Sequence, residues 1–125
     1  MKLLLDSHAY LWWLDDAPEL SRSARSALAD SSNVVFVSAA TIWELEIKRA
    51  LGRLDVGAAD LVAEIAANGF VELPVLARHA AAAARLPRHH DDPFDRMLAA
   101  QSQLEALVCV TRDPGLEAYG VACLR

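Results

Sequence analysis

Four acidic side chains occupy comparable positions in the chain, each beside the end of an expected strand or the start of the helix that follows it. Asp6 comes directly after the expected strand 2–5, and Asp113 closely follows the expected strand 107–110. Glu44 and Asp95 lie early in expected helices. Because open parallel sheets place their sites at the carboxyl ends of the strands, we expect all four acids to project to one rim of the sheet.

Clustered carboxylates of this kind favour a hard divalent cation. Two unit charges about 5 Å apart repel by roughly 3 kcal/mol at an effective dielectric constant of about 20, so a cluster without a counter-ion stays partly protonated at neutral pH. An all-oxygen ligand set suits Mg²⁺, with Mn²⁺ as a substitute, better than zinc. Such a cation lowers the pKa of a bound water and stabilises charge on a phosphodiester. The sequence therefore predicts metal-assisted hydrolysis of a phosphodiester bond.

Each acid also has a purely structural interpretation, which the sequence leaves open. Asp6, Asp95 and Asp113 stand where an acid caps a helix, opens a turn or interacts favourably with a helix dipole. Glu44 has the capping-box spacing from Thr41 and also lies four residues before a lysine with which it can pair. Taken together, these interpretations require unrelated caps to meet at one edge of the sheet.

Apolar, β-branched runs alternate along the chain with helix-forming stretches. The expected strands are 2–5, 34–37, 70–73, 107–110 and 121–124. The expected helices are 8–14, 21–30, 40–51, 58–67, 77–85 and a last one that begins at Asp92-Pro93 and ends near 106. The strands are continuously apolar, which is typical of strands covered on both faces. We therefore expect an α/β fold, a single domain over residues 1–125 with a central, mainly parallel sheet flanked by helices.

The composition is typical of a globular intracellular domain. Of the 125 residues, 54% are hydrophobic and 23% are charged, which excludes a disordered protein. No apolar run approaches the roughly 20 residues that cross a bilayer, and the apolar N-terminal stretch is too short for a signal peptide. Cys109 and Cys123 each lie in an apolar run, which favours free thiols, a cytoplasmic location and no membrane partner. A formal net charge of −5 argues against a polyanionic partner unless cations neutralise clustered carboxylates.

Four parts of the chain together resemble one known family. They are Leu4–His8 with Leu11–Leu14, then Ser38–Glu44, then His90–Arg96 with Leu98–Gln101, and finally Val110–Asp113. The chain resembles the PIN-domain ribonucleases, and most closely the VapC-type toxins of bacterial type II toxin–antitoxin pairs. Each segment alone is weakly diagnostic, whereas the ordered set covers nearly the whole chain with the spacing of the family.

The resemblance implies a PIN fold with an acidic pocket, and it assigns roles to individual residues. The residues that match the metal-binding and catalytic acids of the family are Asp6, Glu44, Asp95 and Asp113. Thr111 matches the hydroxyl residue that supports the pocket, and Ser7 stands where this branch usually has threonine. Asp91 replaces a residue that is often basic. Asp92 matches a further acid of the motif, which we expect to act as an N-cap ahead of a metal ligand.

The activity that the resemblance implies is Mg²⁺-dependent endonucleolytic cleavage of RNA, with a water activated by the metal as the nucleophile. The implied partners are the RNA substrate, a cognate VapB-type antitoxin that fills the active-site groove, and a second copy of the chain in a homodimer. A guanidinium group satisfies clustered carboxylates well, so we expect an antitoxin arginine to enter the acidic pocket.

Basic and aromatic side chains near the four acids have more than one interpretation. Arg96 and Arg112 flank two of the acids and are expected either to contact RNA phosphates or to pair with neighbouring carboxylates. For the three tryptophans, at positions 12, 13 and 43, we expect core packing ahead of a contact with a protein partner, and base stacking last. His89-His90-Asp91-Asp92 could suggest a transition-metal site, but adjacent histidines in a loop lack a defined ligand geometry, so we do not expect one there.

Two other functions compete with a nuclease. A signalling receiver domain has a similar size and layout, but it needs a late lysine, and the only lysines here are Lys2 and Lys48. A catalytically silent PIN-like module that acts by binding protein is the other alternative, and a failure to bind metal would favour it.

Overall fold

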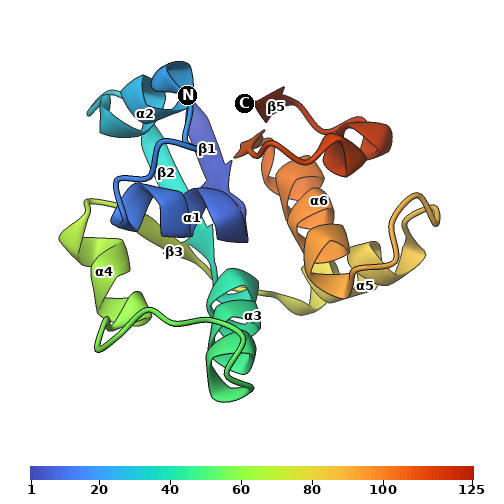
Figure 1. The fold of residues 1–125 in the computed structure, drawn as a ribbon. Coiled ribbons are helices and arrows are strands. Elements are labelled where there is room, and N and C mark those ends of the chain that lie inside the picture. Colours follow the sequence, from blue (N-terminus) through green and yellow to red (C-terminus); the bar gives the residue numbers. More distant parts are fainter.

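The computed structural model describes residues 1–125, and a five-stranded sheet lies at its centre (Figure 1). All neighbouring strands are parallel, in the order β3-β2-β1-β4-β5. The strands are β1 (Lys2–Leu5), β2 (Val34–Ser38), β3 (Val71–Leu73), β4 (Val108–Val110) and β5 (Cys123–Leu124). The predicted α/β class with a parallel sheet flanked by helices is confirmed.

Six α-helices and one 3₁₀ helix connect the strands. They are α1 (Ser7–Leu14), α2 (Arg22–Ala29), α3 (Ala39–Ala50), α4 (Leu61–Ala67), α5 (Ala77–Arg85), α6 (Pro93–Glu105) and the 3₁₀ helix η1 (Pro114–Tyr119). The predicted helix start at 58 is wrong, because the side chain of Asp60 caps α4 by accepting hydrogen bonds from the amides of Val62 and Ala63. The helix η1 is not among the expected helices, although it begins after Asp113, where a turn or helix opening is expected.

Alternate side chains of the central strand point into different halves of the core. Leu3 and Leu5 belong to a cluster that includes Tyr10, Leu28 and Leu45, from α1, α2 and α3. Leu4, between them, packs with Leu73, Leu98 and Leu107 on the other side. Figure 1 shows α1 on one side of the sheet and α6 on the other. Burial on both faces is the reason that β1 is continuously apolar.

The chain changes direction across the sheet between β1 and β4. It moves outward from β1 through β2 to β3 and then returns to place β4 on the other side of β1. Ligands of open parallel sheets bind at such a switch point, beyond the carboxyl ends of the strands. In the register Leu5 lies beside Val110, so the next residues of the two strands, Asp6 and Thr111, leave the sheet together.

None of the helices is both long and apolar enough to span a lipid bilayer. Both cysteines are free thiols, with Cys109 buried and Cys123 half-buried on the neighbouring strand.

Candidate active site

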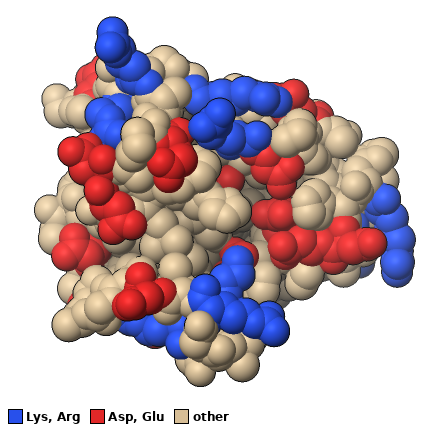
Figure 2. All heavy atoms as spheres, viewed as in Figure 1, with Lys and Arg blue, Asp and Glu red and all other residues tan.

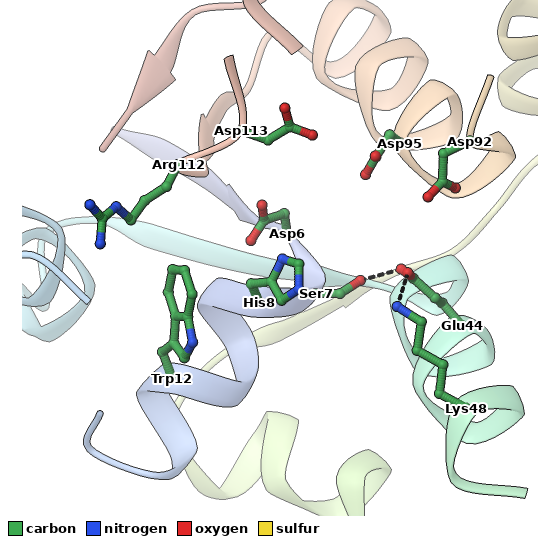
Figure 3. Close-up of a pocket in the computed structure, with 10 residues that line it drawn as sticks. All are labelled: Asp6, Ser7, His8, Trp12, Glu44, Lys48, Asp92, Asp95, Arg112 and Asp113. Carbon is green, nitrogen blue, oxygen red and sulfur yellow. Dashed lines mark hydrogen bonds and ion pairs between the residues drawn. The ribbon is translucent and has the colours of Figure 1, made fainter. Parts of the chain in front are cut away.

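A pocket of about 380 Å³ opens at this switch point (Figure 3). The residues that line it are Asp6, Ser7, His8, Trp12, Glu44, Lys48, Asp92, Asp95, Arg112 and Asp113. The lining therefore contains five carboxylates and only two basic side chains. Figure 2 shows acidic side chains beside the centre of this face and basic side chains gathered above and below them. The structure brings all four acids singled out in the sequence to this one pocket.

Asp6 lies at the floor of the pocket and is held through both carboxylate oxygens. Oδ1 accepts a hydrogen bond from the Ala9 amide at 2.8 Å, which caps α1. Oδ2 accepts the hydroxyl hydrogen of Thr111 at 2.6 Å. Burial raises the pKa of Asp6, although these two hydrogen bonds act in the opposite direction. The carboxylate is thus fixed in orientation and carries a charge that its surroundings do not balance.

Thr111 links Asp6 to Asp113. Its hydroxyl oxygen accepts a hydrogen bond from the Asp113 amide at 3.0 Å while its hydrogen is donated to Asp6. Asp113 in turn caps η1, because its Oδ1 accepts from the Gly115 amide at 2.8 Å. Its other oxygen, Oδ2, takes no part in the cap. Figure 3 shows the Asp113 carboxylate pointing to the side of the pocket where Asp95 lies.

Glu44 enters the pocket from α3. This helix begins at Ala39 with Ser38 as its N-cap, so Glu44 lies in the second turn and the capping-box interpretation is wrong. Its Oε1 accepts the Ser7 hydroxyl, and its Oε2 forms an ion pair with Lys48 Nζ at 2.8 Å. The predicted pairing with the lysine four residues later is therefore present, and it neutralises this one acid of the four.

Asp95 lies in the first turn of α6, and no lysine or arginine pairs with it. The pKa of Asp95 is raised to about 6, first by burial and then by the neighbouring charge of Asp92. Asp92 is the N-cap of α6, as predicted, and its Oδ1 accepts from the Phe94 amide at 2.9 Å. A cation near Asp95 would reverse this effect and hold the carboxyl ionised at neutral pH.

His90 reaches the same acids, which the sequence analysis did not predict. Its Nε2 lies 3.2 Å from Asp95 Oδ2 and 3.4 Å from Asp113 Oδ2. The three side chains place one ligand atom each within 4.8 Å of one another. No regular spacing connects residues 90 and 113, so only the folded chain reveals the contact. The one available signal was a pair of histidines immediately before the Asp-Asp-Pro segment.

Neither Arg96 nor Arg112 pairs with a carboxylate, so the predicted ion-pair interpretation is wrong for both, whereas contact with RNA phosphates stays a prediction. Arg112 lines the pocket and donates to the carbonyl of Glu19 at 3.1 Å. Arg96 lies outside the pocket lining and donates to backbone carbonyls between residues 83 and 90, including those of Ala83 and Leu86 at 2.9 Å each. It fixes the segment between α5 and α6, because positively charged guanidinium groups satisfy several carbonyls at once.

The tryptophans occupy three different environments. Trp12 lines the pocket and stacks on His8 with ring centroids 5.6 Å apart. Trp13 packs against the core and donates from Nε1 to Asn68 at 3.0 Å. Core packing is wrong for Trp43, which is 65% exposed with its ring against Phe94. Trp43 lines an apolar hollow of about 400 Å³. The other lining residues are Ala39, Ala40, Val75, Pro93, Phe94 and Met97.

The residues present fit a hard divalent cation. Asp6, Asp95 and Asp113 offer carboxylate oxygens that are partly or largely withdrawn from water, and no lysine or arginine pairs with any of them. Carboxylate oxygens are the preferred ligands of Mg²⁺ and Mn²⁺. Burial raises the pKa of Asp6 and of Asp95, and a bound cation would favour the charged form of both carboxyls.

Comparison with known proteins places this geometry in a family. The sequence profile described as PIN domain matches residues 3–122. The chain belongs to the PIN domain family. The predicted PIN fold is therefore confirmed, and members of this family are generally nucleases. Among curated protein sequences, none matches the chain.

Solved structures share the fold of this PIN domain at low sequence identity. VapBC2 from Rickettsia felis, bound to a promoter DNA fragment, matches with a TM-score of 0.74 and 13% identity over 99% of this chain and 98% of that chain. VapBC-1 from nontypeable Haemophilus influenzae matches with a TM-score of 0.65 and 15% identity over 99% and 97%. FitAcB from Neisseria gonorrhoeae matches with a TM-score of 0.58 and 22% identity over 98% and 96%.

Proposed function

We propose that this PIN domain is an Mg²⁺-dependent endoribonuclease and the toxin of a type II toxin–antitoxin pair of the VapC type. The observation that carries the proposal is the convergence of Asp6, Asp95 and Asp113, without a lysine or arginine partner, at the switch point of the sheet. A pocket that gathers unbalanced carboxylates destabilises the metal-free protein, so its presence favours a function that needs the charge.

Asp6, Asp95 and Asp113 would hold the cation, and Glu44 faces them across the pocket with Ser7 and Lys48 as its supports. Bound there, Mg²⁺ would lower the pKa of a water and offset the charge that develops on the phosphodiester. Thr111 keeps Asp6 and Asp113 in fixed orientations. Mn²⁺, which prefers the same oxygen ligands, should substitute.

Basic side chains on two sides of the acids support RNA as the substrate. In Figure 3 Arg112 and Lys48 lie on opposite sides of Asp6. Both line the pocket, and Lys48 is 42% exposed at its side chain. We assign the phosphates on either side of the cleaved bond to these two groups, because an RNA backbone is bound chiefly through its charge. Arg96 has no part in this assignment, since its guanidinium is engaged by carbonyls.

A protein partner is supported by the surface beside the pocket. VapBC2, VapBC-1 and a toxin–antitoxin complex from Klebsiella pneumoniae share this fold. We propose that a VapB-type antitoxin inserts an arginine among the carboxylates and so blocks the metal site. We assign the apolar hollow around Trp43 to a second copy of the chain in a homodimer, because exposed apolar surface of this kind marks protein interfaces.

Cleavage of structured RNAs by purified protein tests the nuclease. We expect cutting with Mg²⁺, none with EDTA, and loss of at least about 100-fold in rate for Asp95→Asn, since a carboxylate ligand is removed. Glu72→Gln, which neutralises an exposed acid on β3 outside the pocket, should cut like the wild type. Full activity of Asp95→Asn, or cutting that survives EDTA, would contradict the proposal.

The alternative is a catalytically silent module that acts only by binding protein, and the exposure of Trp43 is the observation that favours it. The two functions differ in metal binding. Titration of Mg²⁺ or Mn²⁺ into folded protein should show saturable binding if the protein is a metal-dependent nuclease. The absence of both cleavage and divalent-cation binding would establish the silent module.

A further inference from the structure

His90 lies against two acids of the pocket and is held through both its ring and its backbone carbonyl. Its ring Nδ1 accepts a hydrogen bond from the Asp92 amide at 3.2 Å. Its carbonyl accepts from the Tyr119 hydroxyl and from Arg96 Nη1, both at 3.3 Å. Arg96 therefore binds the backbone of His90, the same residue whose ring contacts Asp95 and Asp113.

Gly115 completes the enclosure of the ring. A Cβ atom at this position would come within 2.7 Å of His90 Cδ2 and 3.1 Å of Asp113 Oδ1. A Cβ contact as short as 2.7 Å essentially never occurs, so any residue other than glycine would displace the imidazole, whereas the 3.1 Å contact requires Asp113 to move by only a few tenths of an ångström. Gly115 thus lets η1 approach the ring closely.

The hydrogen bond to Nδ1 determines the form of the ring. An Nδ1 that accepts from a backbone amide carries no hydrogen, so the proton of the imidazole resides on Nε2. That single N–H group faces two acceptors, Asp95 Oδ2 at 3.2 Å and Asp113 Oδ2 at 3.4 Å. In this form Nε2 offers no lone pair to a metal, whereas it can donate to carboxylates that bind one.

We propose that His90 is a positioning residue of the metal centre, which shares its Nε2–H between Asp95 and Asp113 and keeps the two carboxylates together for one divalent cation. The inference rests on the proposed nuclease function and adds a residue to its site. It also explains the otherwise puzzling placement of Arg96, whose carbonyl contacts hold the loop that carries His90. Donors behind metal-binding carboxylates fix ligand orientation, and their loss lowers metal affinity.

Titration calorimetry with Mn²⁺ on the full chain tests the inference. His90→Ala should weaken binding by about 10-fold or more. His90→Gln should recover most of that loss, because a glutamine amide can place an N–H donor where Nε2 lies. His89→Ala is the matched control and should bind normally, since His89 is exposed and its ring packs against Tyr119 rather than against the acids. Gly115→Ala, which keeps every ligand but displaces the ring, should weaken binding as well.

The outcomes separate this inference from the function on which it rests. Equal or tighter Mn²⁺ binding by His90→Ala overturns the positioning role. So does a nitrogen coupling in the pulsed electron paramagnetic resonance spectrum of the Mn²⁺-loaded wild type that is absent in His90→Ala, because it would make His90 a direct ligand. No Mn²⁺ binding by the wild type overturns the proposed nuclease itself, together with this role of His90.

Discussion

At the scale of single residues, structural and chemical roles are combined in the same carboxylate. Asp6 and Asp113 each use Oδ1 to cap a helix, which leaves Oδ2 turned toward Thr111 or the pocket. A helix cap fixes the orientation of a side chain and also stabilises the helix by about 1 kcal/mol, so it is well suited to orienting a metal ligand. For Asp6 and Asp113, the capping and ligand interpretations that compete in the sequence are therefore compatible in the fold.

Asp95→Asn should stabilise the metal-free protein at neutral pH. Because the folded pKa of Asp95 is about 6 against an ordinary 3.8, the folded state binds more protons than the unfolded chain between these values, and stability falls as pH rises through this window. Removing the charge should therefore raise the free energy of unfolding at pH 7.5 by up to about 3 kcal/mol. Urea unfolding in EDTA at pH 7.5 and pH 4 measures it. The gain should nearly vanish at pH 4, and an equal gain at both values would contradict this origin.

At the scale of elements, the segment between α5 and α6 is held by one side chain. It is a loop without regular structure, and Arg96 on the first turns of α6 donates to five carbonyls along it and the end of α5. Few apolar contacts are available to such a loop, so a multidentate donor takes their place. The segment carries His90 and ends at the N-cap Asp92, so its order determines the geometry of one wall of the pocket.

Arg96→Leu should loosen this loop and destabilise the fold by about 2 to 3 kcal/mol, because charged hydrogen bonds to partly buried carbonyls are lost. Urea unfolding gives the stability, and hydrogen exchange of residues 86–92 gives the local effect. Arg88→Leu is the matched control, since Arg88 lies exposed in the same loop and makes no side-chain hydrogen bond or ion pair. Similar exchange rates in both variants would show that Arg96 does not anchor the loop.

At the scale of the whole molecule, two surfaces of opposite character lie side by side. The acidic pocket and the apolar hollow share the helices α3 and α6, with Glu44 beside Trp43 in one and Asp95 beside Phe94 in the other. Adjacent residues on a helix project in directions about 100° apart, so one helix can serve both surfaces. A partner that covers the hollow therefore lies next to the proposed metal site.

Trp43→Glu should abolish dimer formation while leaving the fold and Mn²⁺ binding intact. A charge in the centre of an apolar interface is desolvated without a partner, which costs several kcal/mol of association free energy. Sedimentation velocity at micromolar concentration should show a dimer for the wild type and a monomer for the variant. Val62→Glu, at an exposed apolar position on α4, should remain dimeric. A wild type that is monomeric, or a variant that still dimerises, would exclude the hollow as the interface.

The sequence by itself determined the features that depend on neighbours within one element. Strand positions follow from apolar runs, the N-cap Asp92 from its residue type, and the pairing of Glu44 with Lys48 from a four-residue spacing. Because parallel strands end at one edge of a sheet, the approximate meeting place of the four acids also followed from the order of strands and helices.

Only the tertiary structure decided which residues support those acids. Thr111 and Asp6 are 105 positions apart, and the contact of His90 with Asp113 depends on a loop and a 3₁₀ helix that approach each other over Gly115. The exposure of Trp43 and the carbonyl contacts of Arg96 likewise depend on how helices pack. Local spacing specifies contacts along an element, whereas these contacts join segments that come together only when the whole chain closes around its sheet.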